Sequence, residues 1–185
     1  MKMFTIHNVD SNWNKKYEEN KVNNEDILTL DDGLYSQYKY LDKIVNNKNK
    51  KIFSITPNLL LKPNQNQCTS EDKRLNKLGN DWCEYMSLEQ VYAISKIDNC
   101  FIGMHGYNHI RFKKLLEVDK LSEEDVIRRF IRDLDLCFSW FKDHKLNTDI
   151  YCFPYNFTFN RKFVLIIQEK YPEIKTFING GRISW

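Results

Sequence analysis

The sequence has no hydrophobic run long enough to cross a membrane. Its most apolar stretch, residues 52–61, is interrupted by Ser54, Thr56, Pro57 and Asn58, whereas a spanning helix needs about 20 consecutive apolar residues. The opening segment MKMFTIHNVD turns polar too soon to contain the apolar core of a signal peptide. We therefore expect no membrane span and a cytoplasmic location.

The arrangements of cysteine that carry disulfides or zinc are also missing. The chain has five cysteines, an odd number, and no C-x-x-C pair among them. Disulfide frameworks of secreted proteins have even numbers of cysteines, and cysteine zinc sites have closely spaced pairs. The pattern argues against both classes and favours a reducing compartment.

A strong excess of one charge is absent as well, since the formal net charge is +3. The one basic cluster is Lys48, Lys50 and Lys51. We interpret it as a solvated helix end, and we expect no nucleic-acid partner. With 185 residues, 42% of them hydrophobic, the chain has the size and composition of a single globular domain over residues 1–185.

What the sequence does contain is an alternation of short β-favouring runs with segments of helical period. Such an alternation indicates βα units and a mainly parallel sheet, in either an open α/β fold or a barrel. The clearest helix pattern follows Ser122, where an apolar stripe runs opposite acidic and basic side chains. Residues 57–81 show no clear period, which is typical of a functional or mobile loop. The pattern predicts strands at 4–9, 27–30, 52–56, 100–104, 150–153 and 175–178, and helices at 38–45, 87–97, 122–141 and 163–167.

Three groups of polar residues directly follow predicted strands. They are Asp31-Asp32, His105 and Pro154-Tyr155. In parallel α/β folds, functional residues lie at the carboxyl ends of the strands. We therefore expect these three groups at the same end of the sheet.

His105 and His109 stand four residues apart in the segment HGYNH. On one turn of helix, or in a tight helical loop, this spacing places both imidazoles on one face, within reach of one cation. An added carboxylate makes a set that suits zinc or another divalent first-row metal with an open water position. Taken alone, the pair has a plainer explanation as two partly exposed helix histidines.

The adjacent acids Asp31 and Asp32 can supply that carboxylate. One of them can bind the metal, while its neighbour stays free as a base. Gly33 lets the chain turn sharply after them. Taken alone, the acids are explained by a helix N-cap beside a surface acid.

The segments LTLDDG, HGYNH and CFPYN together resemble motifs of the polysaccharide deacetylase family, the NodB-homology domains of carbohydrate esterase family 4. The stretches between them are similar too, and the similarity covers nearly the whole chain. The resemblance implies a distorted (β/α) barrel and a metal-dependent hydrolase that removes N-acetyl groups from amino-sugar glycans. By position, it implies that Asp32, His105 and His109 hold one divalent metal ion, that Asp31 is the general base, and that Tyr155 donates its backbone N–H to the oxyanion.

The same resemblance implies zinc as the metal, with cobalt, nickel or manganese as alternatives, and an N-acetylated amino-sugar glycan or its precursor as the substrate. Tyr107, Pro154 and Trp82 are the residues we expect beside the substrate. For Tyr107, simple packing is an equal alternative.

The chain departs from the family pattern in three places. Gly106 stands where the family often has Ser or Thr, and Cys152-Phe153 stands where it often has an Arg that orients the base. The chain also ends before the family's C-terminal strand with its acid histidine, so the barrel is expected to be incomplete. Either His7 or water then protonates the leaving amine, or the protein is a catalytically weak or inactive glycan-binding relative. The open sheet edge also makes a homo-oligomer an expectation to test.

The acids of the DDG segment have one competing explanation. Haloacid-dehalogenase-type phosphatases also begin with a strand that ends in Asp, but they need a second acid two positions later. In this chain that position is Gly33, and the phosphatase hypothesis leaves both histidines of HGYNH without a role.

Overall fold

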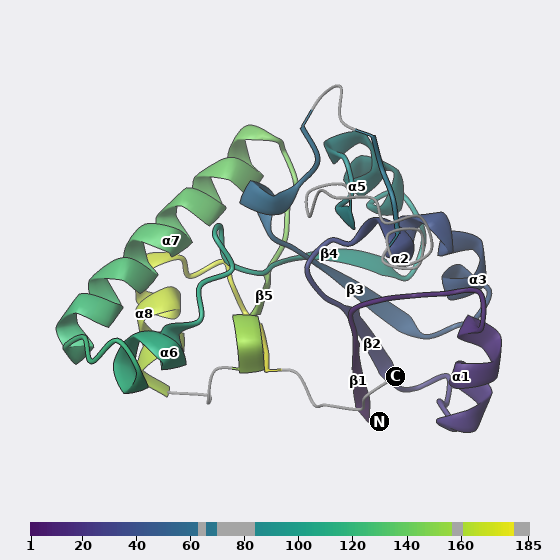
Figure 1. Ribbon diagram of the computed structural model, residues 1–185, viewed down its shortest axis with the longest axis horizontal. Helices are drawn as coiled ribbons and strands as arrows, with labels where there is room; N and C mark the ends of the chain where they lie inside the picture. Colours follow the sequence, from purple (N-terminus) through teal and green to yellow (C-terminus); the bar gives the residue numbers. More distant parts are fainter. Residues whose placement is uncertain (63–65, 70–83, 157–160, 180–185) are drawn as a thin grey trace.

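The computed structural model describes residues 1–62, 66–69, 84–156 and 161–179. Within them, six parallel strands form one sheet in the order of the chain. The sheet curls into a half-barrel with helices around it (Figure 1). The predicted α/β class and incomplete barrel are therefore confirmed at this level. The strands are β1 Met3–Ile6, β2 Ile27–Leu30, β3 Lys50–Ile55, β4 Cys100–Met104, β5 Ile150–Cys152 and β6 Thr176–Ile178.

Parallel pairing brings the carboxyl ends of the strands to one edge of the sheet. Ile6 pairs with Leu30, Ile55 pairs with Met104, and Cys152 pairs with Ile178. Each pair lies at or near the last residue of both strands, so the loops that follow start at the same level. This confirms that the polar groups after β2, β4 and β5 share one end of the sheet.

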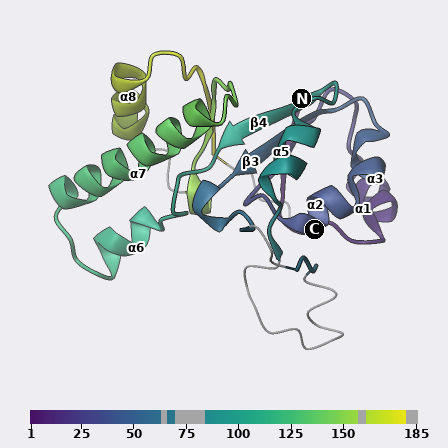
Figure 2. The ribbon, with the colours of Figure 1, turned by 90° about the horizontal axis from the view of Figure 1, so that it is seen from above.

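The helices lie outside the sheet in two groups. Figures 1 and 2 both place α6, α7 and α8 beside the later strands, and α1, α2, α3 and α5 beside the earlier ones. The α-helices are α1 Trp13–Glu19, α2 Tyr35–Lys39, α3 Leu41–Val45, α5 Leu88–Ile94, α6 Phe112–Glu117, α7 Glu123–Asp143 and α8 Arg161–Lys170, and the 3₁₀ helices are η1 Pro57–Leu59 and η3 Pro154–Asn156.

Two helix starts follow the capping signals of the sequence. Ser87 precedes α5, and a complete capping box joins its side chain and backbone to Gln90. Ser122 precedes α7, and its Oγ accepts a hydrogen bond from the Asp125 N–H at 3.1 Å. The helix predicted after Ser122 is therefore confirmed. One of its residues, Asp133, contacts the loop between His105 and His109.

Apolar side chains pack on both faces of the sheet. The main core lies between the sheet and the helices and includes Phe53 and Tyr151. Their neighbours along the strands, Ile52 and Ile150, point to the opposite face and form a small separate cluster with Cys152 and Ile178. Gly103 lies on that inner side, where a Cβ atom would come within 3.2 Å of Ile150 Cγ2. The half-barrel thus has a packed interior, although within the described residues β1 and β6 do not pair to close it.

The structure also corrects several sequence-based expectations. Helices α1 and α6 were not predicted, because neither short segment shows a sustained apolar period. The helix expected over 38–45 is two helices that meet at Tyr40. Cys68 is disulfide-bonded, contrary to the expectation drawn from the odd number of cysteines. Among the described residues, none of the helices combines the length and apolarity needed to cross a membrane.

Candidate metal centre

The two adjacent acids are separated by a sharp turn at the end of β2. Asp31 is still held in the sheet, since its N–H donates to the Ile6 carbonyl at 2.9 Å. Asp32 and Gly33 follow with φ angles of 74° each. A positive φ is uncommon for Asp but is tolerated better by it than by most residues. The turn leaves Asp31 buried and lets Asp32 join the two histidines.

His105 is fixed on two sides at the end of β4. Its backbone N–H donates to the Ile55 carbonyl at 3.0 Å. Its ring is buried, and Nδ1 lies 2.9 Å from the Cys152 carbonyl oxygen, to which only a protonated Nδ1 can donate. That bond directs Nε2 toward Asp32, and a backbone carbonyl on the other ring nitrogen is the usual support of a metal-binding histidine.

His109 reaches the same point from a loop. Residues 105–110 contain no helix, so the helical face suggested by the four-residue spacing is wrong. His109 instead has a φ of 52°, which bends the chain and returns its ring to His105. Their Nε2 atoms lie 3.2 Å apart. The spacing correctly predicted that the two rings meet, but for a different structural reason.

Asp32, His105 and His109 form a candidate metal site. Asp32 Oδ1 lies 3.3 Å from His105 Nε2 and 3.0 Å from His109 Nε2. Zinc bonds of about 2.0–2.2 Å at tetrahedral angles place ligand atoms about 3.3–3.5 Å from one another. The three atoms therefore need only small adjustments to hold an ion of this size, and the set of two imidazoles and a carboxylate fits zinc chemistry.

The electrostatics favour a positive charge between these residues. Burial alone would raise the pKa of Asp32, but hydrogen bonds and charge from His105 and His109 hold it well below its usual range. Burial lowers the pKa of His105, but Asp31 and Asp32 outweigh this effect and raise it. The two carboxylates thus favour positive charge at His105, where a bound cation would also lie.

Asp31 is the acid that stays apart from this triad. It is buried, and its Oδ1 accepts no hydrogen bond within the part of the chain that the structure describes. An unsatisfied buried carboxylate oxygen costs free energy and commonly marks a site where water, an ion or a substrate completes the bonding. The position suits the predicted base.

Tyr155 borders the site from η3, directly after β5. It has a φ of 57° and its ring centroid lies 4.4 Å from that of His109. The side chain is half exposed, and the Arg111 guanidinium lies 5.5 Å from the ring centroid. Asp32, His109 and Tyr155 are thus three non-glycine residues with positive φ around one site. Such strained residues are often found together at functional sites.

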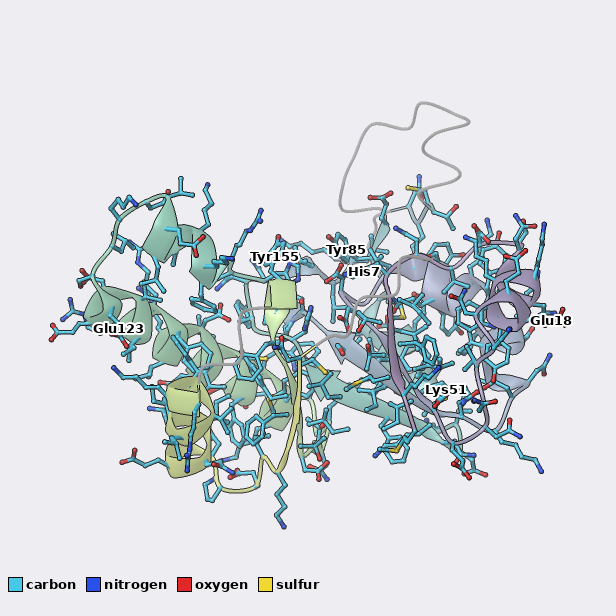
Figure 3. The ribbon with its side chains drawn as sticks, turned by 90° about the horizontal axis from the view of Figure 1, so that it is seen from below. His7, Glu18, Lys51, Tyr85, Glu123 and Tyr155 are labelled. Atoms are coloured by element: carbon cyan, nitrogen blue, oxygen red, sulfur yellow. The ribbon has the colours of Figure 1, made fainter. Side chains whose placement is uncertain are left out.

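His7 follows β1 and approaches the triad from the open side. Its Nε2 lies 3.9 Å from Asp32 Oδ2, and 56% of its side chain is exposed. Figure 3 shows His7 and Tyr155 at the same edge, away from Lys51 near the start of β3. The structure therefore brings together six of the expected site residues, namely Asp31, Asp32, His105, His109, Tyr155 and His7.

The three residues expected beside the substrate differ in where the structure places them. Tyr107 is half-buried, packs against the core and lines a cavity of about 480 Å³ together with Trp140 and His144. Pro154 is buried. Trp82 lies outside the described residues.

Two buried polar residues support the site although the sequence did not single them out. Gln37 of α2 donates from Nε2 to the carbonyls of His7, at 2.9 Å, and Asp31, at 2.6 Å. Asp133 of α7 is 2% exposed and accepts hydrogen bonds from the loop between the two histidines. A signal for Asp133 was present, since it stands three residues after Phe130 and four before Cys137, on the buried stripe and not opposite it.

Comparisons with known proteins bear on the fold. No model of a protein family matches the chain, and no curated protein matches it. Among solved structures, that of IcaB from Ammonifex degensii superposes with a TM-score of 0.61 at 16% sequence identity. The alignment covers 97% of this chain and 77% of that one. At this identity the match shows a shared fold.

Proposed function

We propose that this protein is a metal-dependent deacetylase that removes N-acetyl groups from amino-sugar glycans. The observation that carries the proposal is the triad of Asp32, His105 and His109, next to Asp31, whose buried Oδ1 accepts no hydrogen bond from the described residues. Two supports add to it. The motifs resemble those of polysaccharide deacetylases, and the chain shares its fold with IcaB from Ammonifex degensii.

Asp32, His105 and His109 would hold one divalent ion, with zinc as our first choice. When bound, such an ion lowers the pKa of a water ligand to about 7 and polarises a carbonyl group. The three side chains offer one oxygen and two nitrogen donors, which leaves room for further ligands. Hydrogen bonding of His105 to the Cys152 carbonyl keeps the donor nitrogen aimed at the site.

Asp31 would act as the general base. Its free Oδ1 can accept the proton of the water that attacks the acetamide carbonyl. Because Asp31 directly precedes the proposed ligand Asp32, it would lie close to the reacting water without binding the metal itself. The phosphatase alternative, which would make Asp31 a nucleophile, leaves the histidine pair unexplained.

Tyr155 would stabilise the tetrahedral oxyanion through its backbone N–H. The positive φ of Tyr155 reorients this peptide relative to a regular strand. A well-placed donor of this kind contributes about 3 kcal/mol to transition-state stabilisation.

His7 would protonate the leaving amine. Its side chain is 56% exposed beside Asp32, so a substrate could reach it from solvent, and the Gln37 side chain donates a hydrogen bond to its backbone carbonyl. Water is the alternative acid. Tyr107 and Pro154 would border the bound sugar, with Trp82 a further sequence-based candidate.

One observation favours a second candidate, a weakly active or inactive glycan-binding relative. Cys152 occupies the place where the family often has the Arg that orients the base. Burial, and to a lesser degree Asp31, raise the pKa of its thiol, so it is uncharged at neutral pH and cannot replace a cation. Within the described residues, no salt bridge reaches Asp31.

The test combines metal content with acetate release. Purified protein, before and after incubation with zinc and desalting, would be analysed for metal and then incubated with N-acetylglucosamine oligomers. One zinc per chain, lost in His109→Ala, together with acetate release, supports the enzyme. Zinc without acetate release above a metal-stripped control supports the binding-only relative. Absence of zinc binding would refute both the metal-dependent enzyme and the metal-binding but inactive relative.

A further inference from the structure

We infer that Asp133 of α7 is a positioning residue for the metal centre: it holds the backbone between the two histidine ligands, from a helix that contributes no ligand. The inference rests on the proposed function, because it concerns the same site. It adds a residue that neither the motif resemblance nor the ligand set identifies.

Within the described residues, the hydrogen bonds of Asp133 go to Tyr107 and Asn108, which lie between the two histidines in the chain. Oδ2 accepts a hydrogen bond from the Tyr107 N–H at 2.8 Å. Oδ1 accepts from the Asn108 N–H at 2.9 Å and from the Asn108 side-chain Nδ2 at 2.8 Å. Both carboxylate oxygens are therefore used, and both bind the loop.

These hydrogen bonds stabilise a buried carboxylate for which the described residues provide no ion pair. Asp133 is 2% exposed, and no salt bridge reaches it within the described residues. An ionised carboxylate is costly to bury unless hydrogen bonds compensate it. Consecutive backbone N–H groups in a turn of this kind form a concave site for an anion, and bonds to a charged acceptor are about twice as strong as neutral ones.

The loop approaches the helix at Gly106. Gly106 has a φ of +72°, and a Cβ atom there would lie 2.9 Å from Asp133 Oδ2. A side chain at position 106 and the observed position of Asp133 are therefore incompatible. This relates one departure from the family pattern to Asp133: the hydroxyl residue often found at position 106 is absent, and the carboxylate of Asp133 lies beside Gly106 and holds the loop.

The dependence on Asp133 follows from the shape of the loop. In a helix, backbone hydrogen bonds fix the distance between residues four apart, but residues 105–110 are not helical. Asn58 contacts the loop on the other side, where its N–H donates to the Tyr107 carbonyl at 3.1 Å and its side chain to Asn108 at 3.0 Å. Among the described residues, only Asp133 accepts from both loop N–H groups, and His109 directly follows Asn108. Loss of this anchor should widen the range of His109 positions and weaken metal binding.

The experiment compares zinc dissociation constants of the wild type, Asp133→Asn, Asp133→Ala and a matched control, Asp135→Asn. Asp135 lies on the same helix but accepts from the Tyr171 hydroxyl at 2.7 Å and pairs with Lys170 at 3.2 Å, away from the loop. Supporting residues around metal ligands commonly change affinity by about 10–100-fold. We expect a loss of this size in Asp133→Ala, a smaller one in Asp133→Asn, and none in Asp135→Asn.

A second measurement separates positioning from general stabilisation. Amide hydrogen exchange in the metal-free proteins should become faster at Tyr107 and Asn108 in Asp133→Asn, while α7 itself stays protected. If Asp133→Ala fails to fold, Asp133→Asn and Asn108→Ala decide the matter by the same two readouts. The inference is overturned if the folded Asp133 variants bind zinc as tightly as Asp135→Asn. Failure of the wild type to bind zinc would instead overturn the proposed function, and this inference with it.

Discussion

Gly106 offers a test in which the family resemblance and the structure disagree. The resemblance suggests that Gly106→Ser, which restores a residue common in the family, should strengthen the support of His105. The structure predicts the opposite, because the new Cβ would stand 2.9 Å from Asp133 Oδ2 and 3.4 Å from Pro154 Cγ.

The magnitude follows from two costs. A non-glycine residue held in the left-handed region costs about 1–2 kcal/mol, and overpacking of a buried site costs about 1–3 kcal/mol. Asp133 cannot move aside freely, because its oxygens hold Tyr107 and Asn108. The expected total is about 2–5 kcal/mol, and each kcal/mol lowers the melting temperature of a domain of this size by about 2–4 °C.

The assay is thermal unfolding without metal, followed by zinc titration of the folded protein. Gly103→Ala is the matched control, since its Cβ would press on Ile150 and Ile52 at 3.2 and 3.3 Å inside the half-barrel. We expect both variants to lose stability, but only Gly106→Ser to lose zinc affinity as well. The reasoning is refuted if Gly106→Ser melts within about 1 °C of the wild type and binds zinc equally well.

Three further predictions concern the chemistry of the site. Asp31→Asn should retain zinc and lose acetate release by about 10²–10⁴-fold, the range for a general base; normal turnover would show that Asp31 is not the base. His7→Ala should also keep zinc while turnover falls steeply, and unchanged turnover would remove His7 from the mechanism. The third concerns the stability of the metal-free protein. It should fall as pH drops below about 4, because there the unfolded chain takes up a proton at Asp32 that the folded protein, with its lowered Asp32 pKa, does not. It should fall again as pH rises from about 6.5 through the raised pKa of His105, because the folded protein keeps a proton on His105 that the unfolded chain has lost. Melting temperatures across this range should show the two losses much reduced in Asp32→Ala, and an identical pH profile in that variant would contradict the assignment.

The position of the site at the strand ends explains how an incomplete barrel can still carry it. The triad draws only on β2 and β4, which are both paired on each side within the sheet. His7 and Tyr155 come from the ends of β1 and β5. Pairing between β1 and β6 is therefore not needed to hold Asp32, His105 and His109 in place.

Several features of this protein were determined by local sequence alone. The alternation of strands with helices, the extent of β2 and β4, and the start of α7 at Ser122 follow from periodicity and capping, which act over a few residues. Because parallel strands share their carboxyl ends at one edge, the sequence also predicted that Asp31-Asp32, His105 and Tyr155 meet.

Tertiary structure decided how they meet. The histidine pair comes together through a loop with positive φ at Gly106 and His109, and not through a helical face. Asp133 stands 26 positions after Tyr107 and 25 after Asn108, and no local pattern reports a contact between a helix and a loop so far apart. The spacing of apolar residues in α7 indicates that Asp133 is buried. It gives no reason for a buried acid at this position. A carboxylate is stable in that place only because two backbone N–H groups from another part of the chain face it, and only the folded protein brings them there.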